Sequence, residues 1–339
     1  MKNILLFTTA LVFLLSSLNA QGKNYNINKL NMPQLKENFV FVTYVSDYEQ
    51  VRKASVLINS IRDNAGDYSN CFIYIGVPDT NDFNCDLLKS EGVKFIFLDL
   101  PEEAKNYFYA VKAYAAAQIE KSLDKNVSTL AWFDPETIVF GSVDDLELKG
   151  GYSAVMRPVF LMNKIGLTPD EQPNEFWSPL YNYLNLKIEN IPILETEVDL
   201  IKTRAYYNCG IFSVNPALGI MQEWARVQTI FLKDEEYQKT ACSNVMRKIF
   251  FHQAVFSCVI ISKLKPDEIN PLPISCGYPL ELHGKMPEEK KISKLNNISC
   301  AIIENLWDKN PKWLDEFKAE EPLKTWLQHA TQEYLSTAK

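Results

Sequence analysis

The sequence lacks several features that would point to familiar classes of binding protein. It has no run of Lys and Arg, and its formal net charge is −7, so it offers no positive stripe to follow a phosphate backbone. No two cysteines are spaced as Cys-x-x-Cys, which excludes that type of zinc or redox motif. No linker rich in Gly, Ser or Pro divides the chain, and no internal repeat is present. These absences argue against a nucleic-acid-binding protein and favour one continuous domain.

The composition is that of an ordinary globular protein with a sizeable core. Of 339 residues, 47% are apolar and 23% are charged. The seven cysteines are irregularly spaced, and several lie in apolar contexts such as Phe256-Ser257-Cys258-Val259. A buried free thiol is common in such a context, although an exported protein can also form disulfides. Because the number is odd, at least one thiol stays unpaired, and the sequence indicates no particular pair.

The first 20 residues have the pattern of a secretory signal peptide. Lys2 gives a positive start, Ile4–Leu15 is apolar, and Leu18-Asn19-Ala20 is an acceptable cleavage site. The apolar stretch is shorter than the roughly 20 residues that span a bilayer. We therefore expect an exported protein, periplasmic or secreted, with a flexible polar lead-in over residues 21–36 and no transmembrane span after cleavage. An uncleaved N-terminal anchor is the alternative.

The first half of the remaining chain alternates between strand and helix patterns. Runs of β-branched and aromatic residues predict strands, and apolar residues at helical spacing predict helices between them. The expected strands cover residues 39–45, 71–75, 93–98 and 129–133, and the expected helices cover 51–61, 83–91 and 107–123. This order predicts a parallel sheet with helices on both faces.

Beyond Gly150 the pattern becomes mixed. We expect strands at residues 152–156 and 206–214, an irregular segment at 163–179, and helices at 217–232, 247–261 and 321–336. Apart from the N-terminal segment, no stretch is predicted to cross a membrane.

Asp134-Pro135-Glu136 directly follows the fourth predicted strand. Ligands of open α/β sheets bind beyond the carboxyl ends of strands. Residues two apart on an extended segment point to the same side, so both carboxylates can reach one hard divalent cation. Such a cation can stabilise the charge of a diphosphate leaving group. The alternative is that Asp134 only ends a strand before a turn.

Three segments in the same order resemble the GT-A glycosyltransferases, in particular the glycogenin-like and galactosyl-transferring families. Residues 130–141 resemble the strand with the Asp-x-Asp motif, residues 207–216 the Asn-x-Gly strand, and residues 251–255 the Asp-Gln helix. The resemblance spans about residues 39–261. It implies an α/β fold, a GT-A-like single domain at 37–339 with a mostly parallel Rossmann-like sheet and helices on both faces. Residues 37–150 then form the nucleotide-binding half, and residues 151–339 the acceptor half with the C-terminal helices.

The resemblance also implies roles for individual residues. Asp134 and Glu136, with His283, are the expected ligands of Mn²⁺ or Mg²⁺. His252, Asn208 and Gln253 are expected to line the reacting sugar. The expected contacts of the donor nucleotide and its phosphates are Ser46, Asp47, Lys112 and Arg157.

Each of these assignments has a structural alternative. Asn208 fixes a turn, Gln253 caps its helix, and Ser46 or Asp47 caps the helix after the first strand. Lys112 is a solvated charge on a helix that also bears Glu120 and Lys121. Trp132 and Trp177 are candidates for stacking on a sugar ring, although Trp132, inside an apolar strand, is better explained as core.

The sequence departs from the family at three positions, and these departures keep two functions open. Pro135 and Glu136 alter the metal motif, and His252 stands where the family has Asp. Glu still ligates divalent cations, and His can transfer protons near neutral pH. We expect a metal-dependent glycosyltransferase that moves a sugar from a nucleotide donor to a glycan or protein acceptor. The alternative is a non-catalytic exported protein on the same fold that binds a glycan or a protein.

Overall fold

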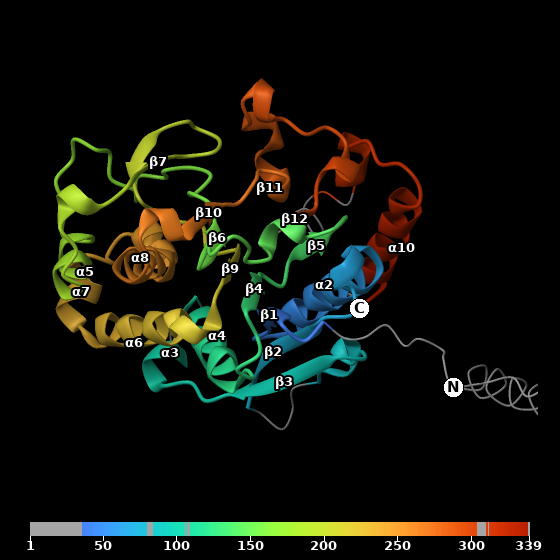
Figure 1. Ribbon diagram of the computed structural model, residues 1–339, viewed down its shortest axis with the longest axis horizontal. Helices are drawn as coiled ribbons and strands as arrows, with labels where there is room; N and C mark the ends of the chain where they lie inside the picture. Colours follow the sequence, from blue (N-terminus) through green and yellow to red (C-terminus); the bar gives the residue numbers. More distant parts are fainter. Residues whose placement is uncertain are drawn as a thin grey trace, which may run out of the picture. The chain divides into compact units, whose positions relative to one another are not determined.

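The computed structural model describes residues 36–79, 84–105, 107, 109–303, 310 and 312–337. The signal peptide and nearly all of the lead-in predicted from the sequence lie outside these residues. By their contacts, Leu35–Lys339 form one compact unit built on a seven-stranded sheet (Figure 1). The strand order is β10-β6-β9-β4-β1-β2-β3.

The strands of the main sheet are mostly parallel, as the sequence predicts. β1 pairs in parallel with β2 and β4, β2 with β3, and β10 with β6, whereas β9 runs antiparallel to both β4 and β6. The bounds of the seven strands are β1 Phe39–Tyr44, β2 Phe72–Pro78, β3 Val93–Leu98, β4 Thr129–Phe133, β6 Ala154–Met156, β9 Ile211–Val214 and β10 Ile269–Pro271. Smaller sheets combine β11 Cys276–Pro279, β12 Cys300–Ile302 and β5 Thr137–Val139, and pair β7 Ile193–Glu195 with β8 Lys202–Arg204.

Helices cover both faces of the main sheet because both faces of its central strands are apolar. In β1, Val40 and Val42 belong to the core cluster that includes α4, α6 and α8, whereas Phe39 and Phe41 belong to the cluster that includes α2. This alternation follows from the two-residue period of a strand. The helix bounds are α2 Tyr48–Asn64, α3 Glu102–Lys105, α4 Ala110–Ser122, α5 Ser178–Tyr183, α6 Ile220–Lys233, α7 Glu235–Thr240, α8 Val245–Lys263 and α10 Leu323–Ser336.

The predicted helix at residues 83–91 is wrong. Phe83 lies outside the described residues, and from Asn84 onward the segment forms only one 3₁₀ turn, Asp86–Leu88. Leu88 is buried and Leu87 is exposed, so the segment has no continuous apolar stripe to hold a helix against the sheet.

Several predicted boundaries also differ from the structure by a few residues. The helix expected from residue 107 begins at Ala110. The strand expected from residue 206 begins at Ile211, because the side chain of Asn208 bonds the backbone N–H of Gly210 at 2.8 Å and forms a local turn instead of a ladder.

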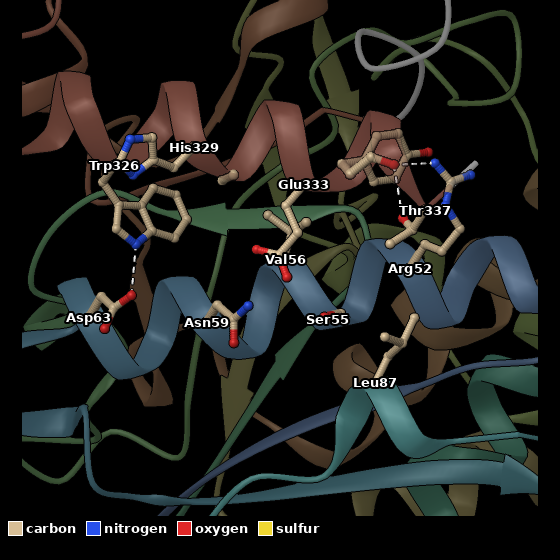
Figure 2. A pocket seen from close by; sticks show the side chains of 12 residues that line it. Arg52, Ser55, Val56, Asn59, Asp63, Leu87, Trp326, His329, Glu333 and Thr337 are labelled. Atoms are coloured by element: carbon tan, nitrogen blue, oxygen red, sulfur yellow. Dashed lines mark hydrogen bonds between the residues drawn. The ribbon is translucent and has the colours of Figure 1, made fainter. Parts of the chain in front are cut away.

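The C-terminal helix α10 packs beside α2, far from it in sequence (Figure 1). The Arg52 guanidinium donates to the Tyr334 carbonyl at 2.6 Å, and the Trp326 indole donates to Asp63 at 2.7 Å (Figure 2). Leu327, which is fully buried, belongs to the core cluster beneath α10.

Among the described residues, one helix, α8, has the length and apolar character of a membrane span. Of its most apolar window, 56% is buried inside the fold. That burial is typical of a core helix.

All seven cysteines lie in the described part of the chain and are free thiols, as the apolar contexts suggest. Six are buried, and Cys85 is partly exposed. Cys276 and Cys300 are register partners on β11 and β12, with their sulfur atoms 3.5 Å apart.

Candidate functional site

A cavity of about 450 Å³ lies where β1 and β4 end. Tyr44 is the last residue of β1, and Asp134 directly follows β4. This is the edge of an open α/β sheet at which ligands bind. The described residues that line the cavity include six of the predicted site residues: Lys112, Asp134, Glu136, Asn208, His252 and Gln253.

Lys112 and Asp134 form a buried ion pair on the wall of this cavity. Lys112 Nζ lies 2.7 Å from each of the two carboxylate oxygens of Asp134, and the Trp132 indole donates to Oδ1 at 2.8 Å. Only 8% of the Lys112 side chain and 15% of the Asp134 side chain are exposed. Burial disfavours the charge on Lys112, but the attraction of the Asp134 carboxylate, together with smaller contributions from Cys209 and Tyr44, raises the pKa of Lys112 above its ordinary value. Lys112 is therefore a fixed positive charge and not a solvated one.

Gly210 is required where it stands because side chains crowd its α-carbon. A β-carbon there would lie 2.6 Å from Ile302 Cδ1 and 3.2 Å from both Asp134 Oδ2 and Asn208 Oδ1. The side-chain oxygen Oδ1 of Asn208 accepts a hydrogen bond from the Gly210 backbone N–H. The side-chain NH₂ of Asn208 therefore stays available to a ligand. The Asn-x-Gly pattern thus fixes a turn and keeps the wall beside Asp134 open.

His252 is a neutral imidazole. Its Nδ1 lies 2.9 Å from the Ile249 carbonyl, which can only accept, so Nδ1 carries the proton and Nε2 is an acceptor. The ring stacks on Tyr109, with centroids 5.6 Å apart and planes at 8°. Burial, together with the charge of Lys112, lowers the pKa of His252 to about 3. The adjacent Gln253 accepts from Cys209 N at 3.3 Å and so links α8 to the turn before β9.

Ser46 and Asp47 do not line the cavity, although both were expected to contact the donor. Asp47 Oδ1 accepts from Gln50 N at 2.8 Å and caps α2. The Ser46 N–H and hydroxyl donate to Gln50 Oε1 at 2.7 and 2.9 Å. Gln50, in the first turn of α2, lines the cavity itself, although the sequence did not single it out.

Arg157 and His283 are likewise absent from the cavity lining. The Arg157 guanidinium is almost fully buried and donates to the carbonyls of Pro273, at 2.8 Å, and Cys276. Its role is to hold backbone near β11, not to contact an anion in the cavity. His283 Nδ1 lies 2.8 Å from the Tyr278 hydroxyl.

The described residues do not complete the predicted divalent-cation site. No group of three or more His, Cys, Asp or Glu side chains within the described ranges is placed to hold a metal. Both oxygens of Asp134 already face Lys112 or Trp132, and His283 is held by Tyr278. Glu136 lines the cavity.

The two tryptophans that are candidates for stacking on a sugar ring are instead buried and bond to other residues of the protein. Trp132 is buried in β4 and orients Asp134, and the buried Trp177 donates to the Ile165 carbonyl at 2.6 Å. Further lining residues that the sequence did not indicate include Tyr44, Tyr109 and Glu281. Tyr44 was the most accessible to prediction, since it ends the first predicted strand.

The fold of this chain is shared with a solved glycosyltransferase structure. The chain resembles WbbM, a bifunctional glycosyltransferase in its apo form, with 13% identity over 90% of this chain and a TM-score of 0.52. It covers 52% of the WbbM chain, about half its length. The galactosyltransferase LgtC, in complex with donor and acceptor sugar analogues, matches with 9% identity over 89% of this chain and 97% of LgtC, with a TM-score of 0.48. GlyE from Streptococcus pneumoniae TIGR4 matches with 13% identity, 89% and 64% coverage and a TM-score of 0.42.

The seven-stranded sheet, with a cavity at its carboxyl edge, gives the chain a GT-A-like fold. Residues 39–262 match the family described as the Rhodobacterales glycosyltransferase domain, and the chain belongs to that family. Comparison with curated protein sequences gives no match.

Proposed function

We propose that this glycosyltransferase takes its sugar from a nucleoside diphosphate donor and transfers it to a glycan or protein acceptor. The observation that carries the proposal is Lys112, a buried cation on the wall of the cavity at the carboxyl end of β4. A fixed ammonium that is shielded from water attracts phosphate oxygens more strongly than one in bulk solvent.

The reaction exchanges one bond at the anomeric carbon of the sugar. The bond from that carbon to the diphosphate oxygen breaks, and its electron pair leaves with the diphosphate. The acceptor hydroxyl oxygen forms the new bond, and its proton passes to the departing diphosphate or to water. Asn208 offers an amide NH₂ and His252 an acceptor nitrogen, so together they can orient sugar hydroxyls.

A divalent cation in solution is expected to strengthen donor binding. The carboxylates of Asp134, Glu136 and Glu281 line the same cavity as Lys112, and their negative charge opposes an anionic diphosphate. Mn²⁺ or Mg²⁺ that accompanies the diphosphate offsets this charge. The proposal therefore keeps the metal preference predicted from the sequence, without assigning a ligand set.

The test is a thermal-shift titration of the full chain with nucleoside diphosphates and their sugars, in Mn²⁺ and in EDTA. A ligand at 100 times its dissociation constant stabilises the folded state by about 2.7 kcal/mol. We expect stabilisation by at least one diphosphate, stronger in Mn²⁺. The double variant Lys112→Met/Asp134→Asn removes both charges of the pair and should lose this stabilisation, whereas Lys121→Met, an exposed change on the same helix, should retain it.

Comparison of the single variant Lys112→Met with the double variant separates the effect on folding from the effect on binding. It leaves the Asp134 carboxylate buried without its cation, which costs about 3–5 kcal/mol of unfolding free energy. The double variant should recover most of that loss while remaining unable to bind the diphosphate. If no nucleotide stabilises the wild type in either condition, the donor proposal fails and the non-catalytic binding role becomes the better account.

A further inference from the structure

A second cavity lies between α2 and α10, and Figure 2 shows it as a groove that runs along both helices. Its volume is about 260 Å³, and none of its lining residues lines the first cavity. Ser55, Asn59 and Asp63 follow one another at four-residue spacing on α2, so they lie on one face of the helix. Trp326, His329 and Glu333 form the matching stripe on α10.

The two helices are linked by polar contacts at the two ends of this groove. At one end the Trp326 indole donates to Asp63 Oδ2 at 2.7 Å. At the other end Arg52 donates to the Tyr334 carbonyl at 2.6 Å and to the Thr337 hydroxyl at 3.1 Å (Figure 2). These contacts hold the walls at a fixed separation, as a preformed binding site requires.

Between its ends, the groove is lined by polar side chains that bond to no other residue. Within the described part of the chain, no side-chain hydrogen bond or ion pair is formed by Ser55, Asn59, His329 or Glu333. These hydroxyl, amide, imidazole and carboxylate groups line the groove, and their hydrogen bonds are left to solvent or to a ligand. The buried Val56 and Ala330 also line the groove.

The charges in the groove select the class of ligand. Asp63 and Glu333 are acidic and Arg52 is basic, so the lining carries more negative than positive charge and disfavours phosphates and nucleotides. Carboxylate and amide oxygens accept hydrogen bonds from hydroxyl groups, and the half-buried indole of Trp326 offers an apolar surface beside them. The volume lies just below the range of drug-sized pockets, which starts at about 300 Å³.

We propose that the groove between α2 and α10 is a glycan-binding site that holds one neutral sugar unit against Trp326. It is separate from the cavity of the proposed function and is suited to hold part of a glycan acceptor or product away from the reacting centre. That the ligand is a glycan rests on the proposed function. That a ligand binds here rests on the lining of the groove.

Trp326 provides a direct readout. The fully buried tryptophans include Trp132, Trp177, Trp224 and Trp313, whereas Trp326 is only half-buried. The full chain is titrated with mono-, di- and trisaccharides of glucose, galactose, mannose and N-acetylglucosamine, and the indole N–H signals are followed by NMR. A Trp326→Phe variant assigns the signal of interest. We expect at least one saccharide to shift that signal in a saturable manner.

The double variant Asn59→Ala/Glu333→Gln removes polar groups that make no bond within the protein, so it should fold normally. We expect it to weaken saccharide binding at least tenfold, whereas Gln332→Ala, an exposed change on α10 outside the groove, should leave binding unchanged. Diphosphate binding in the first cavity, measured on the same variants, reports on the proposed function independently. The proposal is overturned if no saccharide shifts the Trp326 signal, or if the double variant binds as tightly as the wild type.

Discussion

Buried ionisable side chains determine how the first cavity responds to pH. Lys112 keeps its charge because Asp134 faces it, and that charge in turn disfavours a proton on His252. A cationic lysine and a neutral imidazole can therefore share one small cavity. His252 is thus better suited to accept a hydrogen bond than to donate a proton.

The low pKa of His252 makes the protein less stable in acid. Its pKa is about 3 in the folded state and near the ordinary 6.5 in the unfolded state. Between these values the unfolded chain binds the extra proton, so the unfolding free energy falls as pH falls, by up to about 1.4 kcal/mol per pH unit.

Urea unfolding at a series of pH values below 6.5 tests this prediction. His252→Asn keeps a donor for the Ile249 carbonyl but has no group that titrates in this range, so its stability should fall less steeply than that of the wild type. Gln332→Ala changes an exposed residue on α10 that carries no titrating group and serves as the control, with a slope like the wild type. Equal slopes for wild type and His252→Asn would rule out a strongly lowered pKa.

The sequence predicted the residues that line the cavity better than the residues that surround it. Element order indicated that Asp134 lies at the carboxyl edge of the sheet, whereas Lys112 and His252 were expected at the site only from the resemblance to the GT-A glycosyltransferases. All three line the cavity. Asp47 and Arg157 were misplaced for a different reason. A cap and a buried guanidinium look the same in a sequence as a ligand contact, and only the packing of Gln50 or β11 distinguishes them.

Elements with a clear apolar pattern were predicted closely. β3 and β4 have the predicted bounds, because each is a short β-branched or aromatic run between polar residues. The segment at 83–91 has adjacent leucines instead of a helical stripe, and tertiary packing decided its conformation. The contact of α10 with α2 was not predictable, since it joins helices that are about 270 residues apart in the sequence.

The packing of α10 depends on its buried leucine. Leu327 is fully buried in the cluster beneath the helix. Leu327→Ala leaves a cavity there and should lower the unfolding free energy by about 2–5 kcal/mol. Gln328→Ala, one residue away and exposed, should change it by less than about 0.5 kcal/mol. Chemical denaturation of both variants measures this, and similar values for the two would show that α10 adds little to stability.

The compartment in which the protein acts limits the supply of its sugar donor. Nucleotide sugars are made in the cytosol, so an exported glycosyltransferase needs a supply of donor where it acts. The pattern of residues 1–20 favours cleavage and export, because the apolar stretch Ile4–Leu15 is shorter than the roughly 20 residues of a membrane span. We propose that the mature protein begins at Gln21.

Intact mass measurement after expression of the full chain in a bacterial host tests this proposal. We expect the protein in the exported fraction with residues 1–20 removed. Leu11→Arg places a charge inside the apolar stretch and should keep the uncleaved chain in the cytosol. Recovery of the wild type from the membrane with residues 1–20 retained would instead show an anchor. An anchored enzyme could meet donors imported into a secretory lumen, whereas a released one must obtain its activated sugar outside the cytosol.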